Sequence, residues 1–143
     1  MAKILVTDGN YPHTLGIVKS LSLQGHQVDC VGRKFCLSFF SKYLKNLAYE
    51  KRFFNSTNLE KFLNFLKKEN YDFLIPIGAE SISFISKNRK IISDELAINI
   101  PPHKSIEICL NKNKTLKFAE KKGVNIPKVY TRKFLLNYIL DNE

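Results

Sequence analysis

The sequence predicts an α/β fold, with a mostly parallel sheet covered by helices on both faces. Along residues 1–101, short apolar runs of strand length alternate with segments of helical periodicity. The apolar runs lack polar alternation, as is typical of parallel strands that are buried on both faces. Hydrophobic residues make up 44% of the chain and charged residues 25%, a composition that supports a core and excludes a disordered tail.

The strands are expected where apolar runs end at turn residues. The first run ends at a turn cluster around Gly9, the second at Gly32, and a later one at Gly78. Ligands of such sheets bind beyond the carboxyl ends of the strands, so the candidate site narrows to the loops around these three glycines. The predicted strands cover residues 3–7, 27–31, 47–53, 72–78 and 97–100.

Helices are expected between the strands. Leu15, Val18 and Leu21 share one face of a helix that stops at Gly25. A second helix is predicted to begin with a capping box that starts at Thr57, because a glutamate follows three residues later. A third helix is expected over residues 80–90, and residues 33–47 are expected to form a loop with a short helical turn.

The pattern changes after Pro101 and Pro102, where we predict a domain boundary. The expected domains are residues 1–101, a Rossmann-like domain, and residues 102–143, the start of a second domain. The second part predicts two short helices over residues 103–110 and 111–122, an extended segment over 124–131 and a helical pattern over 133–140. Because a new domain begins so near residue 143, we expect the chain to be a fragment.

The net charge of +10 is concentrated in two segments. Residues 111–133 carry eight Lys and Arg residues against Glu120 alone, and residues 33–52 carry six against Glu50 alone. Such segments indicate either a polyanionic ligand, such as nucleotide phosphates or nucleic acid, or a solvated lysine-rich surface.

The remaining bulk features indicate a cytoplasmic protein. No apolar run approaches the roughly 20 residues of a membrane helix, and residue 3 already begins a strand-like run with no signal sequence before it. The cysteines, Cys30, Cys36 and Cys109, show no metal-ligand spacing, and an odd number argues against a closed disulfide framework. We therefore expect that the cysteines are structural thiols and that the protein has no membrane partner.

Two phosphate-binding motifs are absent from the sequence. After the first strand the chain has Gly9 and Gly16 but no G-x-G-x-x-G pattern, and the second strand ends at Gly32 and Arg33 without a carboxylate for a ribose hydroxyl. Asp29, inside that strand, is a poor substitute. No Walker A pattern occurs either.

The tail, residues 111–130, resembles the entry to the ATP-grasp domain. In that superfamily a D-K or D-R pair opens a helix that ends in K-x-G-[IV], and a proline then starts a strand. Here Lys112 lies eleven residues before Gly123, which is the family spacing. The front of the chain resembles the pre-ATP-grasp domain of the carbamoyl-phosphate-synthase-like branch, through Val6–Gly9, Leu23–Val28 and Ile75–Phe84 in that order. The resemblance covers about residues 1–131.

The resemblance implies an ATP-dependent ligase that joins a carboxylate to an amine or related nucleophile through an acyl phosphate. It implies ATP and Mg as cofactors, and a nucleotide-phosphate contact for Lys112, although Asn111 stands where aspartate is usual. A cation at a helix start is locally unfavourable unless an anion binds there. The other ATP-binding and metal-binding parts would follow residue 143, so we expect no ligase activity from this chain alone.

The candidate substrate contacts come from the first and third loops. They are Asp8, Gly9, Asn10, Gly78 and Glu80. Each has a structural alternative, because glycine suits a tight turn and a carboxylate is favourable at a helix start whatever the function. No catalytic or metal-binding residue is assigned, and a small carboxylate and ATP are the expected partners.

Two other functions remain open at this point. A stand-alone Rossmann-like domain that binds a nucleotide or nucleotide-sugar would leave the spacing of Lys112 and Gly123 unexplained. Nucleic-acid binding is suggested by aromatic residues, Phe35, Phe39 and Phe40, among the basic residues 33–52, but no recognition motif supports it and it ranks last. The sequence leaves open a homodimer and the identity of the carboxylate and the amine.

Overall fold

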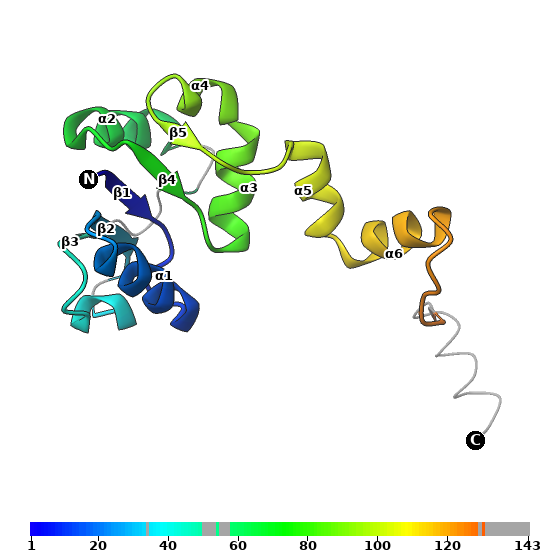
Figure 1. Cartoon of the computed structure of the whole chain (residues 1–143). Coiled ribbons are helices and arrows are strands. Elements are labelled where there is room, and N and C mark those ends of the chain that lie inside the picture. The colour runs from blue at the N-terminus through cyan, green and yellow to red at the C-terminus, as the bar shows by residue number, and fades with distance from the viewer. Residues whose placement is uncertain (34, 50–53, 55–57, 129, 131–143) are drawn as a thin grey trace. The chain divides into compact units, whose positions relative to one another are not determined.

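The computed structural model describes residues 1–33, 35–49, 54, 58–128 and 130 of the chain. It divides into two compact units, Met1–Glu107 and Ile108–Glu143. The first unit is an α/β domain, and the second contains a short helix (Figure 1).

The first unit is built on a five-stranded, fully parallel sheet with strand order β3-β2-β1-β4-β5. This confirms the predicted parallel sheet with helices on both faces. In the register of the central strands, Leu5 lies beside Asp29 on one side and Leu74 on the other. The strands are β1 (Lys3–Val6), β2 (Gln27–Gly32), β3 (Asn46–Tyr49), β4 (Phe73–Ile75) and β5 (Ala97–Ile98).

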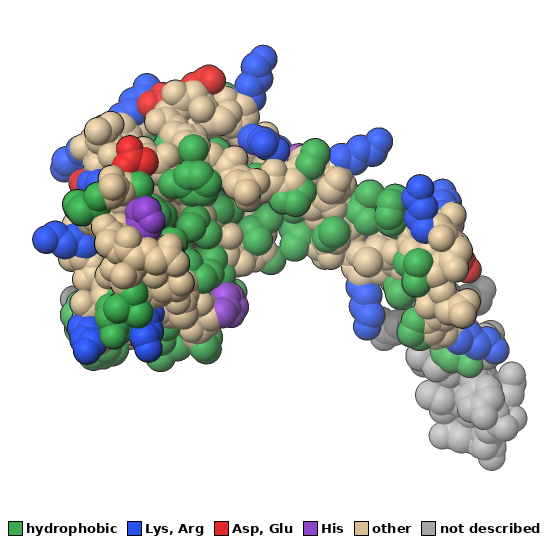
Figure 2. Space-filling model, in the orientation of Figure 1, with side chains coloured by type: hydrophobic (Ala, Val, Ile, Leu, Met, Phe, Trp, Pro, Cys, Tyr) green, Lys and Arg blue, Asp and Glu red, His purple; other side chains and the backbone are tan. Residues whose placement is uncertain are grey.

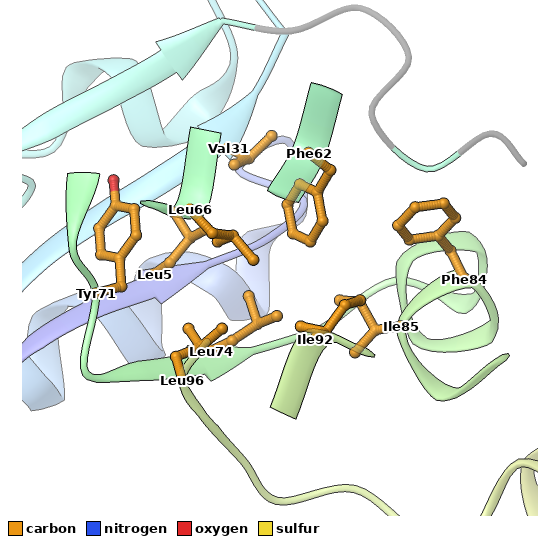
Figure 3. Packing of buried hydrophobic residues seen from close by; sticks show 10 residues of the cluster. All are labelled: Leu5, Val31, Phe62, Leu66, Tyr71, Leu74, Phe84, Ile85, Ile92 and Leu96. Carbon is orange, nitrogen blue, oxygen red and sulfur yellow. The ribbon is translucent and has the colours of Figure 1, made fainter. Parts of the chain in front are cut away.

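Alternating side chains of the central strand enter two separate cores. Ile4 and Val6 pack with Val18 of α1 (Pro12–Leu23) and with Val28 on one face of the sheet. Leu5 points to the opposite face, because successive residues of a strand face opposite sides. There it joins the larger cluster drawn in Figure 3, which also contains Leu74 of the neighbouring strand and Phe62.

The larger core is covered by three helices. They are α2 (Leu59–Glu69), α3 (Ala79–Lys87) and α4 (Arg89–Ser93). Phe62 of α2 is fully buried and forms edge contacts with Phe84 of α3, at 5.8 Å between ring centroids, and with Phe54, at the same separation. Helix α1 therefore covers one face of the sheet and α2–α4 cover the other. This follows from right-handed crossovers, because the connection from β1 to β2 and the connection from β4 to β5 run in opposite directions across the sheet.

The structure corrects one predicted helix. Residues 80–90 were expected to form one helix, but α3 ends at Lys87 and α4 starts at Arg89. Asn88 separates the two helices because its backbone, with φ −102° and ψ 15°, leaves the helical conformation. Its side-chain amide donates to the Phe84 carbonyl at 2.8 Å. The break turns Ile92 into the core, where it is fully buried.

Other local predictions stand as follows. The predicted loop at residues 33–47 contains the expected helical turn, η1 (Leu37–Phe40), but its end belongs to β3, which begins at Asn46. Strands β1, β4 and β5 are shorter than predicted, and β2 is one residue longer. Helix α2 has Asn58 at its N-cap. The predicted cap Thr57, residues 50–53 of the third strand and the helical pattern at 133–140 lie outside the described residues.

Two short helices follow the sheet, as predicted: α5 (His103–Cys109) and α6 (Lys112–Lys121). Asn111 is the N-cap of α6, and its side-chain oxygen accepts from the Lys114 amide at 3.0 Å. Gly123 ends the helix with φ 76°, a backbone conformation that favours glycine. This geometry explains why Asn at 111 and Gly at 123 suit the helix ends.

A buried polar cluster lies in the amino half of the sheet. The Asp29 carboxylate, 1% exposed, accepts from the Tyr71 hydroxyl at 3.1 Å and from the backbone and side-chain amides of Asn46 at 3.0 and 3.1 Å. The Lys3 ammonium lies 4.0 Å from it. Burial and the Asp29 carboxylate raise the pKa of Tyr71. We call Lys3, Asp29, Asn46 and Tyr71 the amino-edge cluster.

Candidate functional site

The strand order creates a switch point at the carboxyl ends of β1 and β4. The chain leaves β1 towards β2 over one face of the sheet and leaves β4 towards β5 over the other. The loops after these strands therefore diverge, and crevices at such points are where α/β sheets bind ligands. The first loop contains Asp8 and the second Gly78.

A hydrogen-bond network ties these two loops together. One carboxylate oxygen of Asp8, Oδ2, accepts from the Gly78 amide at 2.8 Å, from the Ser81 hydroxyl at 2.5 Å and from the Thr7 hydroxyl. The Thr7 hydroxyl also accepts from the Ile77 amide at 2.9 Å. Thr7 and Ser81 are fully buried. The Asp8 side chain thus fastens the β1 loop to the start of α3.

Asp8 has a backbone conformation that serves the same purpose. Its φ of 59° lies in the left-handed region, which aspartate tolerates better than most residues. The Asp8 carbonyl accepts from the Tyr11 amide at 3.1 Å and from the buried Thr14 hydroxyl at 2.9 Å. The turn therefore positions α1 on one side and holds α3 on the other.

Gly9 and Gly78 are sites of close approach. A Cβ on Gly78 would lie 2.6 Å from an Asp8 carboxylate oxygen, and a Cβ on Gly9 would lie 2.8 Å from the Cys30 sulfur and 3.2 Å from the Cys36 sulfur. Both glycines are buried. Their missing side chains allow the loops to pack, which is the structural role that the sequence left as an alternative.

A cleft of about 300 Å³ opens at this edge of the sheet. We call it the carboxyl-edge cleft. It takes residues from the loop after β1, the end of β2 and the first turn of α3, with one aromatic residue from the β3–α2 connection. Its lining residues are Asp8, Asn10, Tyr11, Val31, Gly32, Arg33, Phe54, Ala79 and Glu80.

The electrostatics of the cleft come from Asp8, Arg33 and Glu80. Arg33 and Glu80 are exposed, and neither side chain makes a hydrogen bond or ion pair with any residue that the structure describes. Glu80 lies in the first turn of α3, at the positive end of the helix dipole. The cleft therefore presents one guanidinium and one carboxylate to solvent, while Asp8 is occupied by its own loop contacts.

Three of the five predicted substrate contacts line this cleft, namely Asp8, Asn10 and Glu80. Gly9 and Gly78 lie beneath it in the packing described above. The sequence placed the Gly32–Arg33 loop at the same edge but assigned it no contact residue. Arg33 is therefore the residue that the sequence reasoning missed, and the signal was a basic residue directly after a buried strand.

Lys112, the predicted phosphate contact, belongs to the second unit. It is exposed in the first turn of α6, which holds no acidic residue. A lysine beside the backbone amides of a helix start suits a phosphate group in general, and the phosphate contact of Lys112 stays a prediction. The described residues contain no group of three or more His, Cys, Asp or Glu side chains that could hold a metal ion such as Mg.

Lys and Arg side chains are seen on the surface of both units in Figure 2. Phe35, Phe39 and Phe40, around η1, are 64%, 49% and 74% exposed. Their rings contact one another edge to face, at centroid separations of 5.4 and 5.2 Å. Among the described residues, no helix is long and apolar enough to cross a bilayer.

Comparisons by sequence give no relative: no protein-family model and no curated protein match this chain. Comparisons of structure do. An L-amino acid ligase from Bacillus licheniformis matches with a TM-score of 0.66 and 16% identity over 89% of this chain and 30% of its own. Glycinamide-RNase-transformylase T from Mycobacterium tuberculosis matches with a TM-score of 0.64 and 13% identity over 94% and 37%.

A third match is the biotin carboxylase domain dimer of 2-oxoglutarate carboxylase from Hydrogenobacter thermophilus, in complex with MgADP, ADP and bicarbonate. Its TM-score is 0.59 at 15% identity, over 86% of this chain and 28% of that one. All three are ATP-grasp enzymes, and this chain spans little more than a third of their length or less. The chain therefore has the fold of a portion of an ATP-grasp enzyme, which confirms the resemblance at the level of fold.

Proposed function

We propose that this chain is the N-terminal, substrate-side portion of an ATP-dependent carboxylate–amine ligase. In this proposal, residues 1–101 form the pre-ATP-grasp domain and residues 102–143 begin the ATP-grasp domain. The observation that carries the proposal is the carboxyl-edge cleft at the switch point of a sheet whose fold matches ATP-grasp enzymes. The reaction proceeds through an acyl phosphate.

The role of the described residues is to bind and orient the acceptor substrate. Asp8 fixes the loops after β1 and β4 relative to each other, so the cleft walls are rigid before a ligand enters. Preorganised walls reduce the entropy lost on binding and hold the reacting group in one place. Arg33 and Glu80 supply the charged contacts.

Lys112 is proposed to contact nucleotide phosphate. The matched 2-oxoglutarate carboxylase domain holds MgADP, which supports the use of Mg and ATP in enzymes of this fold. ATP supplies the phosphoryl group that activates the carboxylate, and most of its contacts and those of Mg are proposed to lie beyond residue 143. The 143-residue chain alone is therefore expected to be inactive.

The test is ADP release by the natural full-length gene product, compared with this chain, in the presence of Mg and ATP. We expect ADP release that requires a carboxylate substrate and occurs only with the longer product. In that product, Lys112→Gln should raise the KM for ATP about 10-fold, because one charge-assisted phosphate contact is lost.

Lys114→Gln is the matched control, since Lys114 is also exposed in the first turn of α6 and its backbone amide, which caps against Asn111, is retained. Its KM for ATP should stay unchanged. If no longer product exists, or if this chain binds a nucleotide alone with residues 1–100, the ligase proposal fails. The stand-alone nucleotide or nucleotide-sugar binding domain would then take its place.

A further inference from the structure

We infer that the carboxyl-edge cleft recognises a small amino acid in its zwitterionic form, with the carboxylate on Arg33 and the ammonium on Glu80. The inference rests on the proposed function in that it names the class of acceptor substrate for the same site. It concerns recognition only and involves no covalent step.

The first argument is the pairing of charges. Arg33 and Glu80 line one cleft and have opposite charge, yet they form no ion pair with each other or with other described residues. A ligand that carries one charge of each sign satisfies both groups at once. A simple carboxylate would satisfy Arg33 and leave Glu80 unpaired, and a simple amine would do the reverse.

The second argument is the net charge of the cleft. Among the described residues that line the cleft, Asp8 and Glu80 supply two carboxylates and Arg33 supplies one guanidinium. A phosphate group carries more than one negative charge and would meet this excess of negative charge at close range, where like charges repel. The cleft therefore disfavours a nucleotide phosphate and favours a ligand with a positive group of its own.

The third argument is size and wall chemistry. A volume of about 300 Å³ lies at the lower end of the range for ligand pockets, which suits a small metabolite rather than a nucleotide. Tyr11, Val31 and Phe54 add apolar wall between the two charged groups and the loops. An apolar wall of this kind accommodates an aliphatic side chain.

The experiment is an NMR titration of this chain with matched sets of compounds. L-leucine is compared with isocaproate, which lacks the ammonium, and with isoamylamine, which lacks the carboxylate; L-alanine is compared with propionate and ethylamine in the same way. We expect at least one amino acid to bind about 10-fold more tightly than both of its single-charge analogues, with shifts at Asn10, Arg33 and Glu80.

Variants assign the charges. Arg33→Gln should reduce amino-acid affinity about 10-fold and leave the affinity for the amine analogue unchanged. Glu80→Gln should also reduce amino-acid affinity about 10-fold but leave the affinity for the carboxylate analogue unchanged. The matched controls are Lys104→Gln and Asp94→Asn, which remove the same charges at exposed positions away from the cleft and should change nothing. Equal binding of the analogues, shifts elsewhere, insensitivity to both variants or no binding overturns the inference.

ADP release by the full-length product separates this inference from the proposed function. If ADP release requires a carboxylate that has no amine, and amino acids do not compete, the ligase stands and the zwitterion site falls. If the cleft binds amino acids in the pattern above but no carboxylate stimulates ADP release, the site stands and the ligase proposal falls.

Discussion

Two aspartates, Asp29 within β2 and Asp8 in the loop after β1, differ in how their charged groups are paired. Asp29, in the amino-edge cluster, is 1% exposed and has partners for both carboxylate oxygens within the fold. Asp8, at the carboxyl edge, is half-buried, and only its Oδ2 is engaged, while Arg33 and Glu80 beside it have no partner among the described residues. Polar groups are thus paired internally at one edge and left available at the other.

This difference indicates that charged groups at the amino edge serve stability and that those at the carboxyl edge are available for binding. Buried polar groups contribute only when all are satisfied, so the amino-edge cluster is expected to be intolerant of change. Exposed charges contribute little to stability, since solvent screens them. Substitutions at the amino edge should therefore mainly change stability, and substitutions at the carboxyl edge should mainly change binding.

The largest effect is expected for Asp29→Ala. Removing the carboxylate leaves the buried Tyr71 hydroxyl and the Asn46 amides without an acceptor, and the free energy of unfolding should fall by about 3 kcal/mol. Urea denaturation measures it, with the exposed Asp94→Ala as control, which should lie within about 0.5 kcal/mol of the parent. A loss below about 1 kcal/mol for Asp29→Ala would show that the cluster is not a stability centre.

A smaller loss of stability is expected for Gly78→Ala, and this substitution should also change binding in the cleft. The new methyl group would lie 2.6 Å from the Asp8 carboxylate, so that side chain must move and its bond from the Gly78 amide weakens. We expect a loss of about 2 kcal/mol together with a loss of amino-acid binding in the cleft.

Gly16→Ala is the matched control for Gly78→Ala. Gly16 lies within α1 and a Cβ there has no heavy atom within 4 Å, so alanine should raise the free energy of unfolding by about 0.5 to 1 kcal/mol. Equal stability changes for the two glycine variants in urea denaturation would contradict the clamping role of Asp8.

The smallest effect at ordinary pH concerns Cys30, which is fully buried below Gly9 at the carboxyl end of β2. Burial, with the nearby Cys36, raises the pKa of Cys30 from 9.0 to about 12. The folded state then binds the Cys30 proton more tightly than the unfolded state does. The protonated thiol therefore contributes to the free energy of unfolding in full below about pH 9, and this contribution is lost as the pH rises towards about 12.

Urea denaturation at about pH 8 and about pH 10 tests this sign. Between the two, the parent should lose about 1 kcal/mol more stability than Cys30→Ala, which has no thiol to ionise. Identical pH dependence of the two proteins would mean that the Cys30 thiol ionises as easily in the folded state as in the unfolded state.

The sequence by itself determined the local features. The parallel sheet, the loops at its carboxyl edge and the two helices after Pro102 follow from apolar runs and turn residues, which depend only on neighbours along the chain. It also placed Asp8, Asn10 and Glu80 at that edge, because residues that follow buried parallel strands meet there. The predicted helix over 80–90 was wrong at Asn88, where the backbone leaves the helical conformation and the side-chain amide bonds to the Phe84 carbonyl.

Which charged side chains have hydrogen-bond partners within the fold depends on the tertiary structure. Besides its neighbour Thr7, Asp8 is bonded by Gly78 and Ser81, which are distant in the sequence. Asp29 is likewise bonded by the distant residues Asn46 and Tyr71. Those partners depend on the strand order β3-β2-β1-β4-β5, which local patterns do not encode. The same order brings Arg33 and Glu80, forty-seven positions apart in the numbering, to one cleft and leaves both without an internal partner.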